Sequence, residues 1–182
     1  IDVLNSNRVD WLDTHNRRDM LDDEEWLRCL LKKWQFEADV PADEWTIEKI
    51  KLLRESMGKL TEQICGGVQP EEEQLNAVNA VLEEMPSRSR LQYDHAAFQI
   101  QSFFDKKGWP VVVWEIAYSF AKLLSEGDKT RIKICDNCNC GWIFYDHSKN
   151  KSRRWCDDKV CGNLMKVRRF RERQKEENLK SR

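Results

Sequence analysis

The sequence has little proline or glycine, no long apolar run and almost no net charge. Only 4 of its 182 residues are Pro and 7 are Gly, which excludes a collagen-like chain. No apolar run approaches the roughly 20 residues that span a bilayer, and the run Val111–Trp114 stops at Glu115. By contrast, 8 Trp and 7 Phe favour a packed globule over a disordered chain.

The cysteines are few in most of the chain and concentrated near its end. The opening residues lack a secretory signal, and because the chain starts with Ile we expect its natural N-terminus to be trimmed. A secreted disulfide scaffold would be smaller and more evenly cysteine-rich. The cluster therefore favours a metal site in a reducing compartment, and we predict a cytoplasmic protein. Five of the 7 cysteines fall within 27 residues: Cys135, Cys138, Cys140, Cys156 and Cys161.

The small net charge of −1 hides two regions of opposite sign. Residues 1–128 carry 15 basic and 25 acidic side chains, a net −10, whereas residues 129–182 carry 16 and 7, a net +9. We predict a domain boundary between them, with an acidic body (1–128) and a basic tail (129–182). Such a tail suits a polyanionic partner. Alternatively, the two regions neutralise each other, for example across a homodimer.

The acidic body is mainly helical by pattern. Carboxylates at Asp22–Glu25 suit a helix start, and further helices are expected over 46–65, 70–85 and 111–125. Alternating residues over 90–104 predict a β-hairpin turning near Asp94-His95. The third helix is expected to turn four apolar side chains inward: Leu75, Val78, Leu82 and Met85.

Nothing in the body indicates catalysis. Cys29 and Cys65 lie in helical patterns and are expected to be buried. His15 and His95 are isolated and are interpreted as incidental. The sequence has no nucleophile elbow, phosphate-binding loop or dinucleotide fingerprint, so we predict that the protein is not an enzyme.

The cysteine cluster carries the clearest chemical signal. Cys135, Cys140, Cys156 and Cys161 follow the pattern C-x4-C-x15-C-x4-C. Four thiolates satisfy tetrahedral Zn²⁺ and leave no open position, which predicts one structural zinc ion. By spacing alone, Cys138 is an equally good second ligand in place of Cys140.

A helix is expected over about 158–177, after the last cysteine pair. Val160, Leu164 and Val167 share one face and are expected to pack on a finger hairpin. The other face suits a phosphate backbone and the DNA major groove, although a solvated basic face would look the same. The candidate nucleic-acid contacts are Lys159, Lys166, Arg168, Arg169 and Arg173 on the helix, and Arg153 and Arg154 before it.

The tail resembles the bacterial CGNR zinc finger. The shared positions are Cys135, Cys140, Phe144, Asp146, Ser148, Asn150, Arg153, Arg154, Trp155, Cys156, Cys161, Gly162 and Asn163, followed by Lys166, Arg168 and Arg169. The resemblance implies that Cys140, not Cys138, is the second ligand. It departs at Leu164, where the family has Arg. Because Leu164 lies on the predicted packing face, the basic face is expected to survive.

The first residues, Ile1–Ser6, are similar to the opening of the ABATE domain, the usual partner of this finger, as are Leu53-Arg54 and Leu75-Asn76. The resemblance implies a stress-related transcription regulator with a DNA-binding finger and a domain that senses a ligand. It implies DNA as partner and a small-molecule ligand for the N-terminal domain. The lack of a long apolar run, by itself, predicts that no membrane is involved.

Together, these patterns predict a mainly helical α+β protein. The N-terminal domain would be helical with a β-hairpin, followed by a treble-clef-like zinc finger ending in a basic helix. The predicted function is that of a bacterial, cytoplasmic transcription regulator that contacts DNA through this helix. The rival is an adaptor whose basic finger docks an acidic protein partner, or RNA. An enzyme using a cleft of the body ranks last.

Overall fold

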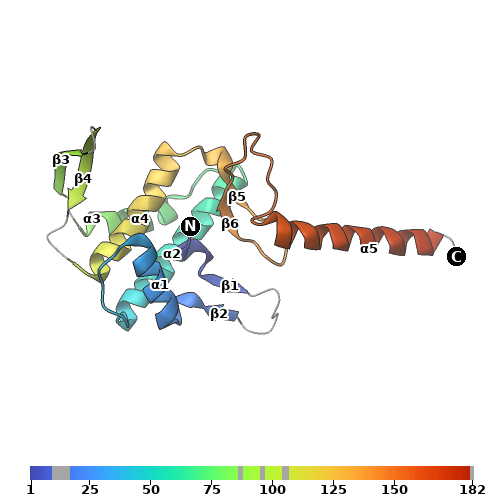
Figure 1. Cartoon of the computed structure of the whole chain (residues 1–182), viewed down its shortest axis with the longest axis horizontal. Coiled ribbons are helices and arrows are strands. Elements are labelled where there is room, and N and C mark those ends of the chain that lie inside the picture. Colours follow the sequence, from blue (N-terminus) through green and yellow to red (C-terminus); the bar gives the residue numbers. More distant parts are fainter. Residues whose placement is uncertain (10–16, 86–87, 95–96, 104–106, 181–182) are drawn as a thin grey trace.

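The computed structural model describes residues 1–9, 17–85, 88–94, 97–103 and 107–180 (Figure 1). Its described part confirms the mainly helical α+β class, with the strands in three antiparallel pairs. The α-helices are α1 (Glu24–Trp34), α2 (Glu44–Cys65), α3 (Glu72–Glu83), α4 (Trp109–Glu126) and α5 (Asn163–Lys180). The strands are β1 (Asn7–Val9), β2 (Arg17–Asp19), β3 (Arg88–Asp94), β4 (Ala97–Phe103), β5 (Ile132–Ile134) and β6 (Ile143–Tyr145).

Acidic caps set the starts of the first two long helices. The Asp23 carboxylate accepts hydrogen bonds from the backbone N–H groups of Glu25, at 2.9 Å, and Trp26, at 3.3 Å. Asp43 accepts one from the N–H of Thr46 at 2.9 Å, so α2 begins two residues before its predicted start. These carboxylates satisfy N–H groups that have no partner within the helix.

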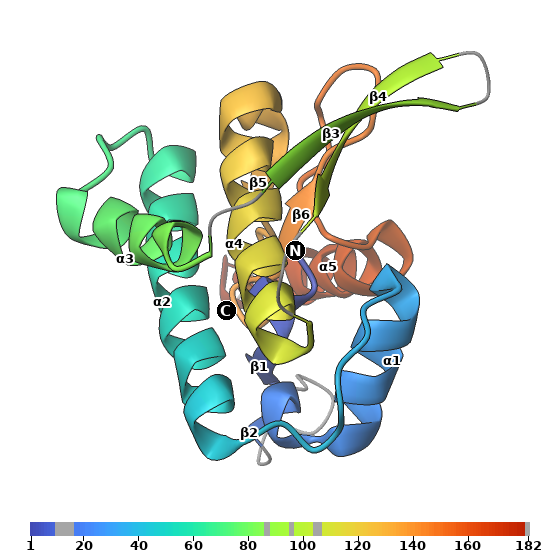
Figure 2. The same cartoon turned by 90° about the vertical axis from the view of Figure 1, so that its left-hand side faces the viewer.

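The core lies where α1, α2, α3 and α4 meet around the start of the chain. Ile50 and Leu60 of α2 and Val112 and Ala117 of α4 are almost completely buried. Figure 2 shows the N-terminal segment running between α1 on one side and α2 on the other. The short helical turn η1 (Val3–Asn5) in that segment contributes Val3 and Leu4 to the same core.

The β5–β6 hairpin packs directly against this core. Ile132 and Ile143 are buried among the core side chains of the body. The Asn5 carboxamide meets the backbone of Ile143 twice: its Nδ2 donates to the carbonyl at 2.9 Å, and its Oδ1 accepts from the N–H at 3.0 Å. This pair of bonds attaches the first residues of the chain directly to the finger.

Three predictions about burial are wrong. Leu75 of α3 is 40% exposed, while its neighbour Gln74 is 4% exposed and faces the core. Gln74 and Leu75 are both one helical turn from the buried Val78. The period alone therefore does not predict which of the two is buried; the neighbouring element that packs on the helix does. Cys29 and Cys65 are exposed rather than buried. His15 and His95 lie outside the described residues.

The β3–β4 hairpin confirms the predicted turn, because the last strand pair joins Asp94 to Ala97. It projects from the body on the side away from α5 (Figure 1). The rings of Tyr93 and Phe98 face each other across the strands with centroids 4.8 Å apart. This cross-strand contact stabilises the hairpin locally, although both rings remain exposed.

Helix α5 extends away from the rest of the molecule (Figure 1). The prediction that Val160, Leu164 and Val167 pack on the finger hairpin is wrong, because they are 43%, 38% and 48% exposed. Cys161 and Gly162 anchor the turn before the helix and are buried there. Beyond that turn, α5 runs past the hairpin without lying on it. No described helix is long and apolar enough to cross a membrane.

Candidate metal centre and basic helix

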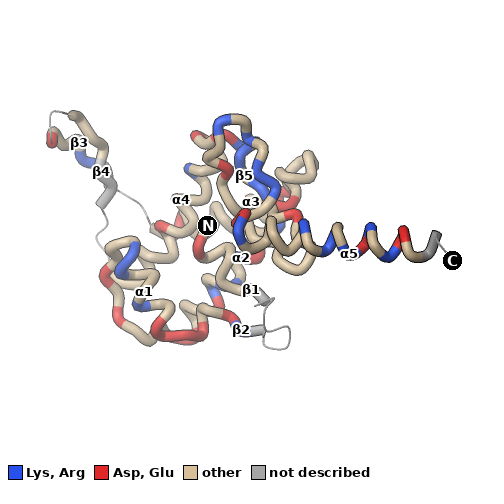
Figure 3. Tube along the Cα trace, turned by 45° about the vertical axis from the view of Figure 1, so that its right-hand side comes forward, with Lys and Arg blue, Asp and Glu red and all other residues tan. Residues whose placement is uncertain are grey.

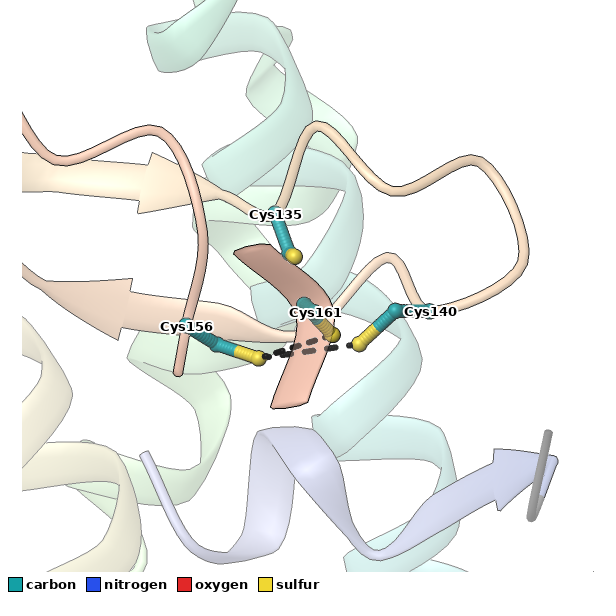
Figure 4. Close-up of side chains that lie close together, drawn as sticks. All are labelled: Cys135, Cys140, Cys156 and Cys161. Carbon is teal, nitrogen blue, oxygen red and sulfur yellow. Dashed lines mark hydrogen bonds between the residues drawn. The ribbon is translucent and has the colours of Figure 1, made fainter. Parts of the chain in front are cut away.

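Four cysteine sulfurs converge at the base of α5 (Figure 4). The Sγ atoms of Cys135, Cys140, Cys156 and Cys161 all lie within 4.8 Å of one another. The Cys156 sulfur is 3.7 Å from those of Cys140 and Cys161. Tetrahedral zinc–thiolate bonds of about 2.3 Å place sulfurs about 3.8 Å apart, so the cluster fits Zn²⁺.

Different elements supply the four thiols. Cys135 follows β5, and Cys140 lies in the loop between β5 and β6. Cys161 lies in the helical turn η4 (Asp158–Gly162), which Asp157 caps by accepting a hydrogen bond from the N–H of Val160 at 2.8 Å. The last ligand is therefore fixed at the beginning of the helical segment that becomes α5.

The structure brings Cys140, and not Cys138, into the cluster. The N–H of Cys140 donates to the carbonyl of Asn137 at 2.8 Å, which closes a tight turn around Cys138. That turn leaves Cys138 exposed, with its sulfur 3.2 Å from Nη1 of Arg168. The two cysteines that spacing alone left as equal alternatives thus have different surroundings.

Asn137 supports the thiol cluster, a role that no pattern in the sequence predicts. Its side chain is buried, and its Nδ2 donates to the Cys161 sulfur at 3.5 Å. Its Oδ1 accepts from the N–H of Asn139 at 3.3 Å, which fixes the orientation of the amide. Partners of this kind orient metal ligands and tune their basicity.

Burial and hydrogen bonding act together on the pKa values of the thiols. Burial raises the pKa of the Cys140 thiol to about 11 and also raises the pKa of Cys156. Burial acts in the same direction on Cys161, but hydrogen bonds from Asn137 and the neighbouring thiols outweigh it and lower that pKa. A metal ion that binds Cys140 and Cys156 therefore displaces their protons.

The loop between the cysteine pairs is organised by one buried carboxylate. Asp146 is fully buried and accepts hydrogen bonds from Lys133 Nζ at 2.8 Å and from the N–H groups of Ser148 and Arg153 at 2.9 Å. Burial alone would raise the pKa of Asp146, but the hydrogen bonds from Lys133 and Ser148 hold it far below its usual range. The Asp146 carboxylate thus joins Lys133 of β5 to two positions of the loop through these hydrogen bonds.

The two arginines before Cys156 are engaged within the finger. The Arg153 guanidinium donates to the carbonyl oxygens of Trp155, at 3.3 Å, and Cys156. It also lies over the Phe144 ring, 5.1 Å from its centroid. Arg154 Nε donates to Asp136 at 2.6 Å. These contacts give Arg153 a structural role and leave Arg154 at the surface with an acidic neighbour.

The predicted basic residues of the last helix are spread along a solvent-exposed rod. Figure 3 shows Lys and Arg positions recurring along α5. Lys166, Arg169 and Arg173 are exposed, and none forms an ion pair with a carboxylate in the described chain. Arg168 pairs with Glu172 at 3.1 Å. Lys159 is exposed too, and its carbonyl accepts a hydrogen bond from Asn163, which stabilises the turn after Cys161.

The fold and the thiol cluster define a zinc-finger protein whose finger is joined to a helical body. Comparison with protein families supports this class: residues 131–174 match the family described as "CGNR zinc finger". Residues 1–127 match ABATE, described as "Putative stress-induced transcription regulator". The chain belongs to the ABATE family, with a CGNR finger that holds one structural Zn²⁺. A comparison with curated proteins found no match.

Proposed function

We propose that this zinc-binding regulator contacts DNA through α5 and its finger, which holds the helix in place. The observation that carries the proposal is the set of Lys166, Arg169 and Arg173, which share a helix face, are exposed and have no acidic partner in the described chain. Such a face suits the phosphate backbone. The net −10 of residues 1–128 repels DNA and leaves the finger and helix as the contact surface.

The cysteine ligands of the finger also indicate the cellular compartment in which the protein works. Cysteine ligands remain available to zinc in a reducing compartment, and none of the seven cysteines forms a disulfide in the structure. We therefore place the regulator in the bacterial cytoplasm as part of the same proposal.

The test is binding of the zinc-loaded full chain to random-sequence duplex DNA across a salt series, followed by fluorescence anisotropy. About four to six phosphate contacts give a log–log slope between about −4 and −5. Replacing Lys166, Arg169 and Arg173 by Ala should reduce the magnitude of the slope by about 3. Absence of binding at low salt would overturn the proposal.

The matched control removes the same charge from the body. Lys32, Lys59 and Lys122 are exposed on α1, α2 and α4 of the body. Their triple replacement by Ala should leave the salt slope unchanged. An equal loss in both triple variants would mean that net charge, rather than the helix face, governs binding.

One observation favours a second candidate, an adaptor that docks an acidic protein partner. Beside the basic face, η4 and α5 together expose an apolar stripe, which protein partners cover more readily than a phosphate backbone. The same titration separates the two, because an adaptor would not bind duplex DNA at low salt. The stripe consists of Val160, Leu164, Val167 and Phe170.

A further inference from the structure

A cavity of about 550 Å³ lies in the helical body, and none of its lining residues belongs to the finger. Its walls come from η1, α1, α2 and α4, the elements grouped around the start of the chain in Figure 2. Most of the wall is apolar, with aromatic rings from Trp34, Phe36 and Phe120. A cavity of this size matches pockets that enclose small organic molecules.

Two carboxylates line the cavity, but only one has a partner. Asp2 accepts hydrogen bonds from Lys33 Nζ at 2.7 Å and from Trp34 Nε1 at 2.8 Å, so its charge is compensated. The Ser119 hydroxyl donates to the carbonyl of Ile116 at 3.0 Å and is also satisfied. Glu115 is half-buried and has neither a hydrogen bond nor an ion pair in the described chain.

An uncompensated carboxylate in an apolar wall is unfavourable until an opposite charge approaches it. Burial raises the pKa of Glu115, which reflects the missing partner. A cationic ligand would supply that charge, and aromatic faces attract organic cations as well as apolar groups. An anionic ligand would meet the uncompensated Glu115 carboxylate and be disfavoured.

We propose that this cavity binds a small organic cation with an apolar body. The ammonium group would pair with Glu115, and the apolar body would lie against Trp34, Phe36 and Phe120. The site is separate from the proposed DNA surface, and its binding can be measured without DNA. Its failure would therefore leave the DNA proposal untouched, and the reverse also holds.

The test uses three probes that share one apolar body and differ in charge: phenylbutylamine, phenylbutanol and phenylbutyrate. Calorimetry with the zinc-loaded full chain at neutral pH should show the amine binding at least about tenfold more tightly than the alcohol, since a desolvated charge pair outweighs a neutral contact. The acid should bind most weakly. Equal affinity for amine and alcohol, tighter binding of the acid, or no binding by any probe would overturn the proposal.

The variant Glu115→Gln keeps the shape of the side chain and removes its charge. It should lose the preference for the amine and keep the affinity for the alcohol, which shows in the same experiment that the cavity is intact. The control Glu126→Gln lies on the same helix, outside the cavity, where Glu126 pairs with Lys122 at 3.7 Å. It should bind all three probes as the unaltered protein does. A Glu115→Gln protein that still prefers the amine would contradict the proposal.

Discussion

Cys138 and Cys140 lie two residues apart, yet only the second points toward the other three thiols. We predict that Cys138→Ser keeps one zinc ion per chain, while Cys140→Ser loses it, because serine is a poor ligand for zinc. Metal content after dialysis, measured by mass spectrometry, checks this. Full zinc retention in both variants would show that the two cysteines interchange.

Asn137 donates a hydrogen bond to the zinc ligand Cys161, so we expect it to contribute to zinc affinity without binding the metal itself. Removing the amide that donates to Cys161 should lower zinc affinity about 10–100-fold, the usual effect of losing such a partner. Competition between Asn137→Ala and a calibrated chelator measures this. Asn139→Ala, at an exposed position of the same loop, is the control and should bind zinc normally. Equal affinity in the two variants would exclude a supporting role for Asn137.

Arg54 joins three segments of the body. It is 8% exposed and donates from Nη1 to Ser6 Oγ and to Asp19 Oδ1, both at 2.7 Å. Arg54→Met leaves the Asp19 charge without its partner and should lower the free energy of unfolding by about 3–5 kcal/mol. Urea denaturation measures the change. Arg28→Met, at an exposed pair with Glu24, should change it by less than about 1 kcal/mol.

The same pair sets a dependence on pH. Burial acts to raise the pKa of Asp19, but the hydrogen bonds from Arg54 and the N–H of Leu21 outweigh it, so the folded-state pKa lies below its usual value. The pair therefore stabilises the fold above the unfolded pKa of about 4, and this contribution is lost as the pH falls through the folded pKa. A pH series should show that Arg54→Met loses this part of the acid sensitivity.

At the scale of elements, α5 is a helix whose apolar stripe lacks a partner within the described chain. We predict that Val167→Gln changes the free energy of unfolding by no more than about 0.5 kcal/mol, since the side chain is already exposed. Ile143→Ala, in the buried hairpin, should cost about 2–5 kcal/mol. Thermal unfolding compares the two variants. A large loss for Val167→Gln would mean that the stripe is covered.

How far the sequence could predict these elements depended on how local their causes are. The starts of α1 and α2 follow from capping carboxylates within a few residues, and the prediction was right to within two residues. The helical period of residues 158–177 also predicts a helix there, and α5 spans Asn163–Lys180. The period of a helix does not say what lies opposite each of its faces, so the predicted packing of Val167 on the hairpin is wrong: the side chain is largely exposed.

The candidate site shows the same division. The four converging thiols follow a spacing that can be read along the chain. Asn137 and Asp146 could not be assigned their supporting roles, because those roles depend on where a loop folds back. Asn5 is a harder case, since its partner Ile143 is 138 residues away.

At the scale of the whole molecule, the metal and the apolar core stabilise different parts. The thiols and Phe144 form one small buried cluster. Ile50 and Val112 belong to the separate hydrophobic core of the body. We predict that a chelator abolishes hydrogen-exchange protection in η4 and α5 and leaves it in α2 and α4. Adding zinc back should restore it. Simultaneous loss in α2 and α4 would mean that the metal maintains the whole fold.

The two hydrogen bonds between the Asn5 side chain and the backbone of Ile143 affect how the chain folds during synthesis. Ile143 is synthesised 138 residues after Asn5. The Asn5 amide therefore has no partner until the whole helical body has left the ribosome. Until then, the face that Ile132 and Ile143 will cover stays open to water. The body is therefore completed last, by the arrival of the finger, and a nascent chain stalled before the finger would be the species most exposed to proteases and chaperones.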